Sequence, residues 1–167
     1  MHEYGPTPSG VVLTEDHPAA PAGAYGRTKL AGTRAVLGAC RDGALDCVVL
    51  RVSNVLGPAA PAGILLGVVA GRLREVARAA GPRGVPRPLR LAPLVDRRDF
   101  VDVRDVAGAV LAAAAASGCS GQIVNIGAGR PVLVRELVLR MVELSGLDVT
   151  VVEDQPADRS RGAVSWQ

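Results

Sequence analysis

Residues 24–53 read AYGRTKLAGTRAVLGACRDGALDCVVLRVS. This stretch shows the alternation of a helix and a strand that continues along the rest of the chain. Residues 24–39 place apolar side chains at helical spacing without a proline, which predicts a helix. After Asp42 and Gly43, the apolar run 46–53 is typical of a short strand that is buried on both faces. A helix followed by a buried strand indicates an α/β protein.

The same alternation continues on the C-terminal side of this stretch. The sequence predicts further helices over residues 62–80, 104–117 and 133–145, and strands over 89–91, 99–103, 122–126 and 149–152. On the N-terminal side, residues 5–23 contain four prolines and three glycines and are predicted to form a loop. The predicted fold class is therefore α/β.

Composition excludes several classes of protein. At 167 residues, with 49% hydrophobic and 21% charged residues, the chain suits one soluble globular domain with a packed core. A net charge of +3 is too small to indicate binding to nucleic acid. The longest apolar run, residues 109–116, is too short to cross a membrane, and no signal peptide is recognised at the N-terminus.

The residues that commonly bind metals do not form a ligand set. Cys40, Cys47 and Cys119 are odd in number and widely spaced, so neither a disulfide framework nor a zinc site is predicted. A reducing cytoplasm is expected for such a chain. His2 and His17 have no matching carboxylates nearby, so no metal is expected.

Tyr25 and Lys29 are the strongest candidates for chemistry. Four residues apart in the predicted helix 24–39, they lie on the same face, one turn apart. An ammonium group beside a phenol favours the phenolate, and such a tyrosine can act as a general acid or base beside a carbonyl or an alcohol. The same spacing also occurs by chance in many helices, so a purely structural role is the alternative.

Several more motifs follow this pair in a fixed order. An acidic proline loop precedes it, and an Arg-x-x-Asn-x-x-Gly-Pro strand end, an Arg-Asp-Phe-Val segment and an Asn-Ile-Gly-x-Gly turn follow. The residues that carry these motifs are 14–18, Arg51, Asn54, Gly57, Pro58, 98–101 and 125–129. On these motifs the chain resembles the extended short-chain dehydrogenase/reductases, which form the NAD-dependent epimerase/dehydratase family.

The resemblance implies a fold and ligands. It implies the C-terminal part of a Rossmann-like, doubly wound parallel sheet with a small substrate-binding α/β portion. Residues 1–60 would be the remnant of the dinucleotide-binding domain and would include the Tyr/Lys helix. Residues 61–167 would be mainly the substrate-binding portion, with returning elements of the sheet. The implied ligands are NAD or NADP and a nucleotide sugar, and a homodimer is a further expectation.

The resemblance also assigns roles at the cofactor end of the site. Tyr25 would be the acid/base, and Lys29 would hold the nicotinamide ribose. Val52, at the end of the predicted strand 46–53, would also contact the cofactor.

A second group of residues would bind the substrate. Asn54 would contact the sugar nucleotide, and Arg98 would reach its diphosphate, for which a guanidinium fork is well shaped. Either Arg159 or Arg161 would supply another phosphate-binding arginine.

Residues 57–105 most resemble reductases of nucleotide-linked 4-keto-6-deoxysugars. The predicted function is therefore hydride transfer between NAD(P) and a hexose carbon, with Tyr25 moving the proton. One alternative is a non-catalytic remnant that binds a sugar nucleotide or a partner chain. A second is an unrelated α/β binding domain, which a large separation of Tyr25 and Lys29 from Asn54 would favour.

The glycine-rich turn that binds the cofactor pyrophosphate in this family has no match in the chain. Gly127 and Gly129 instead indicate a turn before the helix 133–145. The family's substrate-binding Ser or Thr would fall before Met1, so an N-terminal truncation is expected, with the cofactor-binding half largely absent. The strand at 48–52 would then expose an apolar edge, and self-association is expected.

Overall fold

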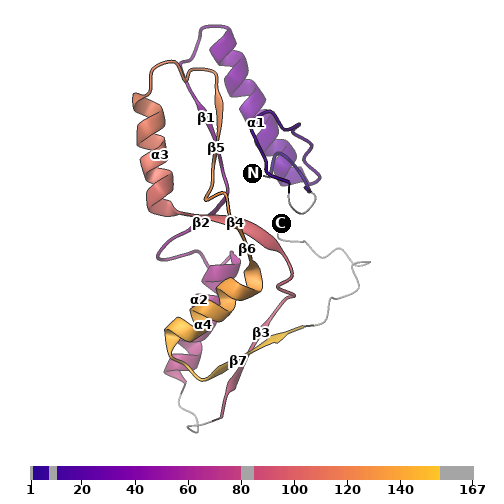
Figure 1. The fold of residues 1–167 in the computed structure, drawn as a ribbon, viewed down its shortest axis with the longest axis vertical. Coiled ribbons are helices and arrows are strands. Elements are labelled where there is room, and N and C mark those ends of the chain that lie inside the picture. The colour runs from indigo at the N-terminus through magenta and orange to yellow at the C-terminus, as the bar shows by residue number, and fades with distance from the viewer. Residues whose placement is uncertain (1, 8–10, 80–84, 155–167) are drawn as a thin grey trace. The chain divides into compact units, whose positions relative to one another are not determined.

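The computed structural model describes residues 2–7, 11–79 and 85–154. Helices and strands alternate along the chain (Figure 1), which confirms the predicted α/β class. The elements are α1 (Ala24–Arg41), β1 (Val49–Val52), β2 (Asn54–Leu56), α2 (Leu65–Arg78), β3 (Arg87–Leu91), β4 (Arg97–Asp102), α3 (Val103–Ala115), β5 (Ile123–Ile126), β6 (Pro131–Leu133), α4 (Val134–Ser145) and β7 (Val149–Glu153). In the part of the chain so described, no helix combines the length and the apolar character that a membrane span requires.

The strands β2 and β6 were not predicted from the sequence. Each has three residues, too few to show a periodic pattern. Gly57 and Pro58 directly follow β2 and indicate a turn at that position. Pro131, the first residue of β6, is typical of the boundary of a helix and not of a strand. Proline is compatible with the first residue of a strand because that position need not donate a ladder hydrogen bond.

The chain divides into two compact units. Of the described residues, the first comprises those up to Leu56 together with Asp99–Arg130, and the second comprises Gly57–Arg98 and 131–154. One boundary between them falls inside β4. The sequence predicted that residues 1–60 are the remnant of the dinucleotide-binding domain and that residues 61–167 are mainly the substrate-binding portion. Because these are statements about ligand binding, they stay predictions.

Parallel strand pairs form the centre of the first unit. β1 pairs with β5 from Val49↔Ile123 to Val52↔Ile126, and β2 pairs with β4, with Asn54 opposite Phe100. Figure 1 shows the β1–β5 pair between α1 and α3.

The strand β1 is less buried than its sequence predicts. Three of its four residues are half-buried, and only Arg51 is fully buried. Among the described residues, β5 is the only strand that pairs with β1, so the opposite edge of β1 has no strand beside it. This edge is therefore open to pairing.

The second unit has the larger apolar core. β3 and β7 pair in parallel, with Arg87 opposite Val149, and α2 contacts α4. The buried apolar residues of this unit are Val69, Leu73, Leu89, Leu91, Leu94, Val134 and Val138. Helix α2 closely approaches the preceding loop because Gly67 has no side chain: a Cβ there would lie 1.9 Å from the Pro61 carbonyl oxygen.

Candidate functional site

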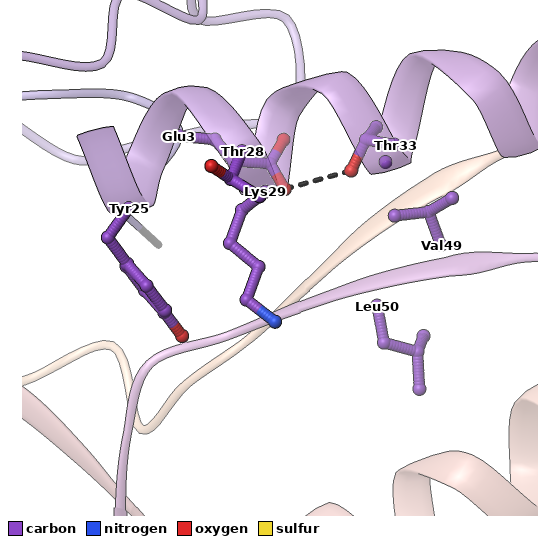
Figure 2. A pocket seen from close by; sticks show the side chains of 8 residues that line it. Glu3, Tyr25, Thr28, Lys29, Thr33, Val49 and Leu50 are labelled. Carbon is purple, nitrogen blue, oxygen red and sulfur yellow. Dashed lines mark hydrogen bonds between the residues drawn. The ribbon is translucent and has the colours of Figure 1, made fainter. Parts of the chain in front are cut away.

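The N-terminal end of α1 presents the predicted pair of side chains. Tyr25 lies in the first turn and is 61% exposed, and the Lys29 ammonium lies 5.5 Å from the centre of the Tyr25 ring. Figure 2 shows both side chains extending from α1 toward the side where Val49 and Leu50 lie. The structure thus brings Tyr25 and Lys29 together, as their spacing predicts.

His2, which precedes the loop, also contacts the Tyr25 ring. The rings of His2 and Tyr25 meet edge to face, with centroids 5.2 Å apart. This contact depends on Gly26, which is buried: a Cβ there would lie 2.5 Å from the His2 carbonyl oxygen. Gly26 was not predicted to belong to the site. A glycine inside the predicted helix, directly after Tyr25, could have indicated that another part of the backbone approaches closely there.

A pocket of about 520 Å³ opens beside this pair. Its lining residues are Glu3, Tyr25, Thr28, Lys29, Gly32, Thr33, Val49 and Leu50. Helix α1 and the preceding Glu3 contribute the polar side chains, and β1 contributes the two aliphatic ones. Within the described ranges, Lys29 has no ion pair or hydrogen bond, and its recorded contact is with the Tyr25 ring. Its ammonium donors are therefore available to a ligand.

A buried ion pair anchors residues 2–4, here called the N-terminal segment, at the edge of this pocket. The Glu3 carboxylate accepts hydrogen bonds from Arg51 Nε at 3.0 Å and from the Thr33 hydroxyl at 2.8 Å. The Arg51 and Glu3 side chains are 5% and 10% exposed. One carboxylate thus joins the segment to both α1 and β1.

A second set of contacts anchors the same segment to β5. The Tyr4 hydroxyl donates to Asn125 Oδ1 at 2.8 Å, and the Arg51 guanidinium lies 4.6 Å from the Tyr4 ring centre. The Asn125 backbone N–H donates to Glu15 at 2.7 Å, and this bond lowers the pKa of the Glu15 carboxyl. Arg51 therefore holds the N-terminal segment to β1, and Asn125 holds the loop to β5, although the sequence marked both only as motif residues.

Val52 is the last residue of β1, and Asn54 is the first residue of β2. The Asn54 amide donates to the Asp99 carbonyl oxygen at 3.0 Å, and Val52 lies opposite Ile126 in the ladder. Neither residue lines the pocket of Tyr25 and Lys29. Between them, the Ser53 hydroxyl is buried without a hydrogen-bond partner in the described structure.

Of the three predicted phosphate-binding arginines, Arg98 belongs to the second unit. Arg98 Nη2 donates to the Asp96 carboxylate at 2.8 Å. Arg159 and Arg161 lie outside the described residues. The role of each in substrate binding stays a prediction.

The turn at 127–129 binds a carboxylate of the chain itself. The backbone N–H groups of Ala128 and Gly129 each donate to Asp99 at 3.2 Å, and the Arg130 N–H donates at 3.4 Å. A Cβ on Gly127 would lie 2.2 Å from Asp99 Oδ2. These donors are already used, which supports the interpretation that this turn is not a cofactor loop.

The aspartates at 99, 102 and 105 do not form a cation site. Asp102 caps α3 by accepting from the Arg104 N–H at 2.8 Å, and it also binds the Arg104 guanidinium at 2.7 Å. The hydrogen bond from the Arg104 side chain holds the pKa of Asp102 well below its usual range. Asp99 has a different partner, because its carboxylate accepts hydrogen bonds from the 127–129 turn. No group of metal-binding side chains occurs among the described residues.

The model of the NAD dependent epimerase/dehydratase family matches residues 1–127. The chain is 42% identical over 167 residues to the dTDP-6-deoxy-L-talose 4-dehydrogenase (NAD(P)(+)) of Kitasatospora kifunensis, covering 100% of this chain and 51% of the relative. The chain therefore spans about half the length of that relative.

Two solved structures show the same fold. The structure of RMD from Pseudomonas aeruginosa complexed with NADPH has a TM-score of 0.81 at 22% identity, covering 94% of this chain and 51% of the other. The Thermus thermophilus UDP-glucose 4-epimerase complex with NAD has a TM-score of 0.71 at 29% identity, covering 94% of this chain and 50% of the other. The family model, which matches more than half of the chain, places the chain in the NAD-dependent epimerase/dehydratase family, as its motifs predicted.

Proposed function

We propose that this chain carries the acid–base part of an NAD(P)-dependent nucleotide-sugar oxidoreductase of the 4-keto-6-deoxyhexose reductase type. The observation that carries the proposal is the joint position of Tyr25 and Lys29 on one face of α1, beside a pocket of about 520 Å³. The 42% identical relative is a dTDP-6-deoxy-L-talose 4-dehydrogenase, which supports this sugar class.

In this proposal the chain's own residues move the proton. The bound nicotinamide cofactor supplies or accepts the hydride. Tyr25 Oη donates the proton to the sugar oxygen in reduction and accepts it in oxidation. The Lys29 ammonium, 5.5 Å from the ring centre, stabilises the phenolate and donates to the hydroxyls of the nicotinamide ribose.

The residues fit one end of NAD or NADP. An exposed phenol and an unpaired ammonium beside an open pocket suit the nicotinamide ribose. The pyrophosphate end requires free N–H groups at a glycine-rich turn before a helix. In the described part of the chain, the candidate turn at 127–129 gives its N–H groups to Asp99. The proposal therefore assigns only the ribose end to Tyr25 and Lys29, with Val52 as a further cofactor contact.

The substrate side of the proposal rests on polar residues that now have partners inside the chain. Asn54 would exchange its bond to the Asp99 carbonyl oxygen for the sugar nucleotide. Arg98 would turn from the half-exposed Asp96 carboxylate toward the substrate diphosphate. Arg159 or Arg161 would add the second guanidinium. A cytoplasmic location fits a chain whose cysteines are free, and a homodimer is part of the proposal.

Dinucleotide binding tests the proposal. We expect NADPH or NADH fluorescence to change on titration with the purified chain and binding to weaken in Lys29→Met. As a control, Lys29→Arg keeps the positive charge and should retain more of the affinity. No binding of either dinucleotide to the wild type would contradict the proposal.

A second candidate function is a non-catalytic chain that binds a partner. The open edge of β1 favours it, because an unpaired strand edge can accept a strand from another chain. Absence of dinucleotide binding together with concentration-dependent association would support this candidate over the oxidoreductase.

A further inference from the structure

The end of α1 and the start of β1 are joined by a tight turn. Gly43 adopts a left-handed conformation with φ +70°, its N–H donates to the Cys40 carbonyl oxygen at 3.0 Å, and the Ala44 N–H donates to the Ala39 carbonyl oxygen at 2.9 Å. This pair of bonds is the Schellman arrangement that ends helices at a glycine. It reverses the chain, so Cys47 returns alongside Cys40.

Backbone bonds fix both cysteines in this arrangement. Cys40 is part of α1, and the Cys47 carbonyl oxygen accepts from the Gly121 N–H at 2.8 Å. The Cys40 thiol lies 3.7 Å from the same carbonyl oxygen. Their Sγ atoms are 2.8 Å apart, approaching the length of about 2.05 Å of a bonded disulfide. The two sulfur atoms are therefore held together by the fold.

We propose that Cys40 and Cys47 form a reversible disulfide site that crosslinks the C-terminal end of α1 to the segment just before β1, and that Cys119 remains a thiol. Both paired cysteines are partly exposed, so a small oxidant can reach them. Sequence spacing gave no reason to pair them, because their proximity depends on the turn at Gly43 and on the bond to Gly121.

The proposed oxidant is a low-molecular-weight disulfide such as oxidised glutathione. The Cys40 thiolate attacks one of its sulfur atoms, which breaks the small disulfide, releases one reduced thiol and leaves a mixed disulfide on Cys40. Cys47 then loses its proton and attacks the Cys40 sulfur, forming the Cys40–Cys47 bond and releasing the second reduced thiol. Two electrons and two protons pass from the cysteine pair to the small disulfide.

The hydrogen bond between the two thiols suits this order of steps. That bond raises the pKa of Cys47 to about 11. Cys47 therefore stays protonated at neutral pH as long as Cys40 remains a thiol. Formation of the mixed disulfide on Cys40 removes the thiol-to-thiol bond. Cys47 can then act as the resolving thiol.

Equilibration with oxidised glutathione tests the proposal. We expect free thiols to fall from three to one per chain, because the pair is consumed, and dithiothreitol to restore all three. Peptide mass spectrometry without reduction should show the peptides of Cys40 and Cys47 linked within one chain. The same treatment in concentrated urea should give a mixture of pairings, since the folded geometry is lost.

Single substitutions locate the bond. In Cys119→Ser, the linked peptides should form as in the wild type, whereas Cys40→Ser and Cys47→Ser should give none. Retention of all three thiols by the folded wild type, or a crosslink to Cys119, would overturn the proposal. The wild-type peptide map decides the question even if a serine variant fails to fold.

Discussion

At the scale of single residues, the site depends on the close approach of the N-terminal segment to α1. Gly26→Ala places a methyl group 2.5 Å from the His2 carbonyl oxygen, so the segment must move. We expect the free energy of unfolding to fall by about 1–3 kcal/mol, as for other overpacked sites, when measured by urea denaturation.

Gly32→Ala is the matched control on the same helix. No atom lies within 4 Å of the added methyl group, so the change should only reduce the freedom of the unfolded backbone. We expect a gain of about 0.5–1 kcal/mol. Equal effects of the two substitutions would show that the segment does not pack on Gly26.

The buried Glu3–Arg51 pair predicts a second residue-scale effect. Glu3→Gln leaves the Arg51 guanidinium, 5% exposed, without its counter-charge, and we expect a loss of about 3 kcal/mol in urea denaturation. Glu143→Gln removes a partner of Arg140 from an exposed pair and should leave stability nearly unchanged. A small loss for Glu3→Gln would mean that the segment is not anchored in solution.

At the scale of elements, the sequence predicts what depends on local order. The long helices show a periodic pattern and lie within a few residues of their predicted bounds, and the shared face of Tyr25 and Lys29 follows from helical geometry alone. Contacts between distant residues were not predictable. Asp99 binds a turn about thirty residues further along, and Tyr4 binds Asn125, 121 residues away. Neither partner can be read from spacing.

Glu153, at the end of β7, links three parts of the second unit. It accepts from Arg135 of α4 at 2.6 Å and from the Leu94 N–H at 2.9 Å, and the Arg135 bond is the main cause of its lowered pKa. A carboxyl with a lower pKa in the folded state stabilises the fold above its unfolded pKa of about 4.3, and this contribution is lost as pH falls through the folded value.

This linkage predicts a specific change in acid sensitivity. Glu153→Gln should lower the melting temperature at neutral pH, and the deficit should shrink as pH falls through the folded pKa of Glu153. Circular dichroism melts across the acid range measure both effects. A melting-temperature difference between variant and wild type that stays constant with pH would show that Glu153 contributes no pH-dependent stability.

At the scale of the whole molecule, the open edge of β1 predicts association. Its half-buried aliphatic side chains and unpaired edge offer a surface for another strand. We expect the molar mass from light scattering to rise with protein concentration. Val49→Lys, which places a charge on this strand, should weaken the association. A monodisperse monomer that unfolds cooperatively would contradict this prediction.

The two tyrosines allow the same chemical change at a catalytic and at a structural position. Tyr4→Phe removes a buried hydroxyl that donates to Asn125, so it should cost about 1 kcal/mol of stability and leave turnover unchanged. Tyr25→Phe removes an exposed hydroxyl, so its effect should fall on turnover and not on stability.

The most direct test is therefore NADP⁺ reduction by the chain with dTDP-6-deoxy-L-talose, measured for the wild type, Tyr25→Phe and Tyr4→Phe. We predict that kcat falls by about 10²–10⁴ in Tyr25→Phe and stays near the wild-type value in Tyr4→Phe. Equal turnover by Tyr25→Phe and the wild type would contradict the assignment of Tyr25 as the acid/base, and no turnover by the wild type would contradict the proposed oxidoreductase function of this chain.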